Sequence, residues 1–180
     1  MPSYRIPDVP YISQDEQYLC VPASFQMCLE YLYKKGRISK QLDFIAICKL
    51  LKTTNLGSTW NPPITQKKFK KEIPILNVVQ TSNSNLPMIE SELGNNMPSI
   101  VHFNLNKLEF DVRGTSGHAA VVVGKTTENL IVHDPFKKQN NKVYTEDFME
   151  AWRLENKRLT RFKFEVRAMS LDRWSKNARD

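Results

Sequence analysis

The stretch 14–24 constrains this chain more than any other, because it places a cysteine where a polar loop gives way to a helix. After Cys20, apolar residues recur at i, i+3, i+4 and i+7, which is typical of a helix that packs one face against a core. These residues are Phe25, Cys28, Leu29 and Leu32. Pro22 suits the first position of such a helix, and Gly36 suits the residue just after its end. We therefore expect a helix over about 21–35 with Cys20 at its N-terminus.

A cysteine at a helix N-terminus is well placed to act as a nucleophile. The first N–H groups of a helix have no partner inside it, and they stabilise a negative charge placed beside them. Because the thiolate is the reactive form of cysteine, this position favours a reactive Cys20 near neutral pH. The other two cysteines, Cys28 and Cys48, fall on apolar stripes, so we expect small core residues there rather than a disulfide or redox pair.

Two more helices are expected before the middle of the chain. One covers about 40–52, with Ser39 as its cap, and a short basic one covers about 65–72. The first would turn inward the side chains of Leu42, Ile45, Cys48 and Leu51. The stretch 54–64 between them is expected to be a loop, and its Trp60 is a candidate to line a cleft, although packing in the core is an equal alternative.

From residue 73 the pattern changes from helices to strands. Strands are expected over residues 73–80, 98–105, 119–124, 130–133 and 160–169, with helices over 84–94 and 145–156. Helices that come first and antiparallel strands that come later are the order of an α+β fold rather than of alternating β-α-β units.

A thiol nucleophile needs a base, and hairpin geometry favours His118. If the strands on either side of Thr126 and Thr127 form a hairpin, even-numbered residues pair with even-numbered ones. His118 then lies opposite Asp134, or one diagonal step away on the same face, within reach of its carboxylate. An aspartate there would fix the tautomer of the ring and stabilise the imidazolium. Either residue alone would be ordinary structural chemistry, so the pairing is what indicates a site.

The other two histidines fit the role less well. His133 would point to the opposite face of the hairpin, and a register slip of one residue would exchange it with His118. His102 lies inside an apolar strand without a nearby acid, so we interpret it as structural. Gln14 stands six residues before Cys20, where its amide N–H and the backbone N–H of the cysteine could form an oxyanion hole.

Taken together, these motifs resemble papain-like cysteine peptidases, and more closely the bacteriocin-processing (double-glycine leader) peptidase family. The resemblance spans about residues 9–153. It is carried by Val9-Pro10-Tyr11-Ile12-Ser13-Gln14, by Cys20-Val21-Pro22-Ala23-Ser24, by Gly117-His118-Ala119-Ala120-Val121-Val122-Val123-Gly124, by His133-Asp134-Pro135, and by Phe148 followed by Trp152.

The resemblance implies a papain-like α+β fold in one domain, residues 1–180. A helical lobe over about 14–72 would carry the cysteine, and an antiparallel sheet lobe over about 73–170 would carry the histidine and the aspartate. Carried over residue by residue, the nucleophile is Cys20, the general base and acid is His118, its orienting carboxylate is Asp134, and the oxyanion residue is Gln14. No metal and no cofactor is implied.

Two features depart from the family pattern. Members often have Gly or Asp before the cysteine and Gly after it, whereas this chain has Leu19 and Val21, whose bulk would narrow the cleft. Members that process secreted peptides are usually fused to a transporter with a nucleotide-binding domain. This sequence has neither a transmembrane run nor a Gly-rich phosphate loop, so leader removal coupled to export is not implied.

The function expected from the sequence is hydrolysis of peptide bonds by a papain-like cysteine endopeptidase acting on a peptide or protein. An acyltransferase or transglutaminase-like enzyme would use the same cysteine, histidine and aspartate with an amine as acceptor in place of water. A peptide-binding module that keeps the fold but does not cleave is the alternative from another class.

Composition and charge bound the partners and the compartment. The chain has 180 residues and a net charge of +7, divided as −3 in 1–33, +8 in 34–72, −3 in 73–152 and +5 in 153–180. The basic excess avoids the expected site, which favours a solvated surface over a nucleic-acid-binding one. Three cysteines without metal-type spacing suit free thiols in a reducing compartment. With no signal peptide and no membrane span in the sequence, a cytoplasmic location is expected.

Overall fold

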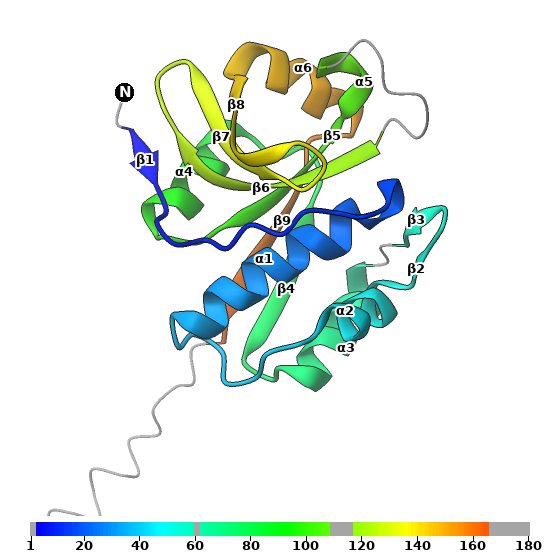
Figure 1. Ribbon diagram of the computed structural model, residues 1–180. Coiled ribbons are helices and arrows are strands. Elements are labelled where there is room, and N and C mark those ends of the chain that lie inside the picture. The colour runs from blue at the N-terminus through cyan, green and yellow to red at the C-terminus, as the bar shows by residue number, and fades with distance from the viewer. Residues whose placement is uncertain (1–2, 60–61, 109–116, 166–180) are drawn as a thin grey trace, which may run out of the picture.

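The computed structural model describes residues 3–59, 62–108 and 117–165, and a large antiparallel sheet dominates it (Figure 1). The strand order is β4-β9-β5-β6-β7-β8, with β1 paired to the far end of β6. The bounds are β1 Tyr4–Arg5, β4 Leu76–Thr81, β5 Ser99–Asn104, β6 Gly117–Lys125, β7 Asn129–Asp134, β8 Lys138–Tyr144 and β9 Arg158–Phe164. A separate hairpin pairs β2 (Thr53–Thr54) with β3 (Gly57–Ser58).

Helices cover the sheet and precede most of it in the chain. Their bounds are η1 Gln17–Leu19 (a 3₁₀ turn), α1 Cys20–Lys34, α2 Phe44–Leu51, α3 Pro62–Glu72, α4 Leu86–Gly94, α5 Leu105–Leu108 and α6 Thr145–Leu154. The expected α+β order is confirmed, and α1 lies across the sheet with α2 and α3 beside it (Figure 1).

Helix α1 ends as its sequence indicates. Gly36 has a φ of +66°, a left-handed conformation that glycine adopts without steric cost. Its N–H bonds the carbonyl of Tyr33, and the N–H of Arg37 bonds the carbonyl of Leu32, which is the Schellman pattern. Pro22 differs from expectation because it is the third residue of the helix rather than the first. It is tolerated there because the first-turn N–H groups have no partner within the helix.

The predicted cap of α2 was wrong. The helix begins at Phe44, and the Asp43 side chain, rather than Ser39, accepts a hydrogen bond of 2.7 Å from the backbone N–H of Ala46. An aspartate at this position satisfies an otherwise unpartnered N–H group of the first turn. The buried face also differs, because Ile47 is fully buried whereas Ile45 is 66% exposed. The buried set of α2 is Ile47 and Leu51, and Cys48 is half-buried.

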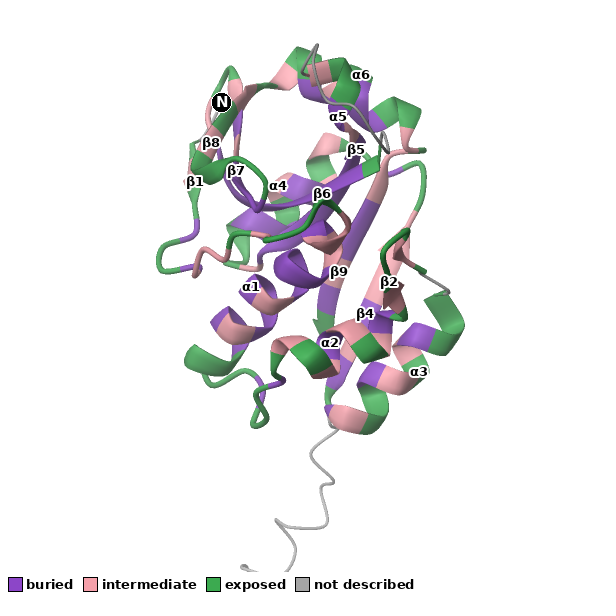
Figure 2. Cartoon of the chain, turned by 45° about the vertical axis from the view of Figure 1, so that its right-hand side comes forward, coloured by how far each residue is buried: buried purple, intermediate pink, exposed green. Residues whose placement is uncertain are grey.

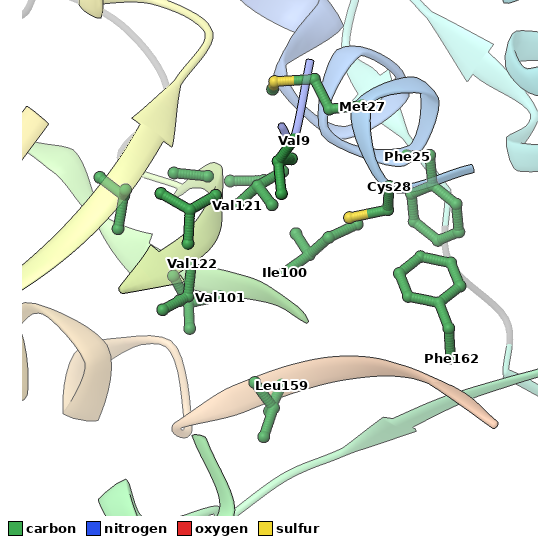
Figure 3. Packing of buried hydrophobic residues seen from close by; sticks show 14 of the residues in the cluster. Val9, Phe25, Met27, Cys28, Ile100, Val101, Val121, Val122, Leu159 and Phe162 are labelled. Atoms are coloured by element: carbon green, nitrogen blue, oxygen red, sulfur yellow. The ribbon is translucent and has the colours of Figure 1, made fainter. Parts of the chain in front are cut away.

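The core between α1 and the sheet is built around aromatic side chains. Phe25 stacks on Phe69 of α3 at a centroid distance of 5.3 Å and meets the edge of Phe162 of β9 at 5.7 Å. Figure 3 shows Cys28 lying in the same core, between Phe25 and Ile100. The expected core role of Cys28 is therefore confirmed, and the inward side of α1 forms a continuous buried stripe (Figure 2).

The opposite face of the sheet is covered partly by α6. Phe148 stacks on Trp152 at 5.3 Å and contacts the edge of Phe103 of β5 at 6.1 Å. The indole N–H of Trp152 donates to the carbonyl of Arg158 at 2.9 Å, so the buried polar atom has its partner. This contact joins the end of α6 to the start of β9.

Strand β8 was not expected from the sequence. Its residues are mostly exposed and polar, and they lack the apolar alternation that identifies a strand. It forms because β7 offers a free edge, and the two strands pair along most of their length. Polar residues suit an outer strand, since an apolar edge would invite pairing with another chain.

Candidate active site

Cys20 is the first residue of α1 and is 7% exposed. The 3₁₀ turn η1 leads directly into it, and no side chain caps the helix at Leu19. The first-turn N–H groups have no side-chain acceptor, and the positive end of the helix dipole lies beside the sulfur, where it stabilises negative charge.

His118 and Asp134 meet at the ends of two neighbouring strands. The pair Val122–Val132 puts even-numbered residues opposite each other, and a bulge shifts the register only on the far side of that pair. His118 therefore sits one diagonal step from Asp134, as the hairpin argument predicted. Its Nε2 lies 2.7 Å from Oδ1 of the carboxylate, and both side chains are buried.

Backbone N–H groups near Asp134 fix the orientation of its carboxylate. Oδ1 also accepts hydrogen bonds from the N–H groups of Phe136 at 2.9 Å and Lys137 at 3.3 Å, in the turn that follows β7. The hydroxyl of Tyr11 donates to the backbone carbonyl of Asp134 at 3.2 Å. The carboxylate is therefore oriented toward His118 before any ligand binds.

The imidazole of His118 has a partner on each side. Nε2 is bonded to Asp134, and the Cys20 thiol lies close enough to the ring to raise its pKa, which leaves Nδ1 as the nitrogen for the thiol. Burial alone would lower the pKa of His118. The hydrogen bonds to Asp134 and Cys20, with their negative charges, outweigh burial and raise the pKa to about 9. The ring is thus held as an imidazolium around neutral pH.

Gln14 is anchored close to this group but does not line the cleft. Its backbone N–H donates to the carbonyl of Pro135 at 2.9 Å, which ties its loop to the turn after Asp134. Its side-chain Nε2 donates to the carbonyl of Glu16 at 3.0 Å, and Oε1 is buried without a partner. The amide thus has one N–H engaged and one free.

A cleft of about 610 Å³ opens beside Cys20 and His118. Its walls come from the loop before α1, from the β2–β3 hairpin and from the starts of β6 and β9. The lining residues are Glu16, Gln17, Tyr18, Cys20, Val21, Asn55, Leu56, Gly57, Ser58, His102, Gly117, His118 and Arg158. Of the two bulky neighbours of the cysteine, Leu19 and Val21, only Val21 is among these lining residues. Trp60, the other residue expected to line the cleft, lies outside the described residues.

The sequence did not indicate the hairpin that forms one wall of the cleft. Its stretch was expected to be a loop, yet Thr53 and Ser58 pair through their hydroxyls at 2.8 Å. Gly57 has a φ of +105°, which requires glycine, and this was the one local signal of a tight hairpin. Leu56 at the tip is 86% exposed and faces the cleft.

The remaining histidines occupy different places. His133 points away from the site, as expected: its Nε2 donates to the carbonyl of Val9 at 3.1 Å, and its Nδ1 accepts from Asn140. His102 is buried, but it also lines the cleft, which its place in an apolar strand did not indicate. Within the described ranges, no cluster of three potential metal ligands occurs, and no helix there is long and apolar enough to cross a membrane.

Comparison with protein families gives a match that covers most of the chain. The model of the Peptidase_C39 like family matches residues 6–159. No curated protein matches the sequence.

Solved structures share the fold. A protein from Bacillus anthracis described as a C39-like peptidase is 17% identical, with a TM-score of 0.69 over 92% of this chain and 99% of that one. A double glycine motif protease from an AMS/PCAT transporter, solved with the leader peptide, is 22% identical (TM-score 0.61, 90% and 95%). The peptidase domain of Streptococcus ComA, a bifunctional ABC transporter of a quorum-sensing pathway, is 18% identical (0.59, 87% and 99%). The predicted papain-like α+β fold is confirmed.

Proposed function

The chain belongs to the Peptidase_C39 like family and is a cysteine peptidase, and from this premise we propose that Cys20, His118 and Asp134 form its catalytic triad. One observation carries the proposal. The buried imidazole of His118 is hydrogen-bonded to the Asp134 carboxylate and lies beside the Cys20 thiol, at the wall of an open cleft. That order of groups turns a thiol into a nucleophile and leaves a proton on the ring for the leaving group.

In the first step the Cys20 thiolate, whose proton is held on Nδ1 of the His118 imidazolium, attacks the carbonyl carbon of a peptide bond. The carbonyl oxygen becomes an oxyanion beside the first turn of α1, and the backbone N–H of Cys20 is its proposed first donor. His118 then returns the proton to the leaving nitrogen, the C–N bond breaks, and a thioester remains on Cys20.

In the second step His118 takes a proton from water, which attacks the thioester carbonyl. The second tetrahedral intermediate collapses, Cys20 leaves as the thiolate and the acid product departs. Asp134 keeps the ring oriented throughout, because its carboxylate is fixed by two backbone N–H groups as well as by Nε2. This chemistry uses only side chains and water, so we expect EDTA to leave cleavage unchanged.

Gln14 is the proposed second donor to the oxyanion. One N–H of its amide is bonded to Glu16 and the other is free, while Oε1 has no partner to hold the group in place. A small rotation of this amide toward Cys20 would exchange the bond to Glu16 for one to the oxyanion. Loops with such donors often reach their final geometry only when substrate binds.

A peptide-library digest read by mass spectrometry tests the proposal. The library includes Gly-Gly sequences, because one structural neighbour is a double glycine motif protease. We expect wild type to cut internal bonds and Cys20→Ala to cut none. Products joined to an added amine rather than to water would instead identify an acyltransferase. Labelling of Cys20 without turnover on any peptide would reject the peptidase function for this chain.

A further inference from the structure

His102 lines the cleft, yet the proposed mechanism does not use it. It lies on β5, where it pairs with Ala119 of β6, and the next residue, Phe103, pairs with His118. Only 6% of its surface is exposed, and that surface faces the cleft. An imidazole so close to the proposed base needs a defined protonation state, because each ring nitrogen either donates or accepts.

The neighbours of His102 define which nitrogen carries the proton. Its Nε2 lies 3.3 Å from the amide nitrogen of Gln80 and 3.1 Å from the hydroxyl of Thr160. An amide nitrogen can only donate, and a hydroxyl can do either. Nε2 is therefore an acceptor, and the proton of the neutral ring sits on Nδ1.

The protonated nitrogen Nδ1 is the unbonded side of a ring that lines the cleft. No group in the described part of the chain bonds it, and it is not sealed from solvent like the unpartnered buried atoms elsewhere in those residues. The cleft thus presents an unused N–H donor, fixed in direction by the bonds at the other side of the ring.

The ring also stays neutral. Burial, with the positive charges of Arg158 and His118 beside it, lowers the pKa of His102 to about 3. A neutral imidazole with this pKa is not protonated at working pH and does not repel the imidazolium of His118. Its chemistry in the cleft is therefore that of a hydrogen-bond donor and not that of an acid or base.

We propose that His102 binds the peptide substrate by donating a hydrogen bond from Nδ1 to a main-chain carbonyl oxygen. Every peptide bond carries such an acceptor, and a neutral donor matches it without requiring a charged side chain on the substrate. The proposal rests on the proposed peptidase function and assigns His102 to binding, separate from the triad.

Steady-state kinetics on a peptide selected from the library digest tests the proposal with two variants. His102→Phe keeps an aromatic ring but removes the donor. His102→Asn is the matched variant, because its side-chain amide keeps an N–H donor close to the position of Nδ1. We expect His102→Phe to raise KM about tenfold with little change in kcat, because it loses one hydrogen bond that is equally strong in the ground and transition states. We expect His102→Asn to keep KM closer to the wild-type value.

His133→Phe is the matched control, because it removes a buried histidine that does not line the cleft. It should lower thermal stability and leave KM unaltered. With wild type active, an unchanged KM in His102→Phe, or the same rise in KM in His102→Phe and His102→Asn, would overturn the binding role and make His102 a core residue only. No cleavage by the wild type would instead overturn the peptidase function, and this proposal with it.

If these variants fail to fold, nitrogen NMR of the histidine rings in Cys20→Ala replaces the kinetics. We expect the His102 ring to show its proton on Nδ1, and the Nδ1 signal to shift when the selected peptide is added. A proton on Nε2, or an Nδ1 signal that saturating peptide does not move, would overturn the proposal.

Discussion

His118 and His102 differ in protonation state, although they lie on neighbouring strands, are both buried and line the same cleft. His118 has a carboxylate as partner, and its pKa is raised to about 9. His102 has a hydroxyl and an amide, and its pKa is lowered to about 3. Since burial lowers the pKa of both rings, the difference comes from their partners. A carboxylate and a thiol beside His118, against a hydroxyl and an amide beside His102, distinguish an ionised acid–base group from a neutral donor.

Replacing the ionised histidine should have the largest effect. His118→Ala removes the base that activates Cys20 and the acid that protonates the leaving amine, so we expect kcat to fall by about 10³-fold or more. His102→Phe should act mainly on KM. If His118→Ala keeps activity and His133→Ala removes it, the assigned base is wrong and the site lies on the other face of β7.

Gln14→Ala tests whether Gln14 acts in the transition state, in contrast to His102, which is proposed to bind the substrate. Loss of an oxyanion donor should lower kcat by about 10²–10³-fold with little change in KM, the reverse of the pattern expected for His102→Phe. Alkylation of Cys20 builds no oxyanion and should proceed largely as before. Unaltered kinetics would mean that Gln14 only anchors its loop to Pro135.

Asp134→Asn tests whether the carboxylate causes the contrast between the two rings. An amide oxygen can still accept from Nε2 of His118, but it brings no charge to stabilise the imidazolium. We expect kcat to fall by about 10²-fold, less than for His118→Ala, and the pKa of His118, followed by NMR, to fall toward its ordinary value. A pKa that stays near 9 would assign the raised value to another group.

The two histidines should also affect stability at opposite ends of the pH scale. The folded pKa of His118, about 9, exceeds its ordinary value of 6.5, so its stabilisation is full below pH 6.5 and is lost as the pH rises toward 9. The folded pKa of His102, about 3, is below 6.5, so folding weakens as the pH falls from 6.5 toward 3.

Urea unfolding across the pH range measures both trends. The difference in unfolding free energy between wild type and His118→Gln should be on the order of 3 kcal/mol below pH 6.5 and shrink above it. In His102→Phe the unfolding free energy should fall less steeply than in the wild type as the pH drops from 6.5 toward 3. The assigned charge state of His118 would be contradicted if the His118→Gln curve of unfolding free energy against pH ran parallel to the wild-type curve above pH 6.5. The same result for His102→Phe below pH 6.5 would contradict the assigned charge state of His102.

The parts of the molecule that local pattern encodes were predictable. The stripe after Cys20 and the glycine at position 36 were enough to place α1, and hairpin parity brought His118 to Asp134 despite the bulge beyond Val122. Both rest on short-range geometry, in which a helix period or strand alternation determines which side chains share a face.

What the sequence missed depends on tertiary structure. Strand β8 forms on an edge that β7 provides, and its polar residues carry no signal of their own. The cap of α2 is a local exception, because the sequence offers two suitable cap residues and the helix begins after Asp43 rather than after Ser39. The sequence did not indicate that His102 lines the cleft, because the residues around it form an apolar strand. Such a strand can be covered along most of its length and still reach a cleft at one residue.

The pH dependence of Cys20 alkylation tests the pairing with His118 most directly. Iodoacetamide labelling of the folded protein, mapped by mass spectrometry, is compared among wild type, His118→Ala and His133→Ala. We predict that Cys20 is labelled before Cys28 and Cys48 at mildly acid pH, that His118→Ala moves this labelling to higher pH, and that His133→Ala does not. Earlier labelling of Cys28 or Cys48, or a Cys20 profile that His118→Ala leaves in place, would contradict the thiolate–imidazolium pair.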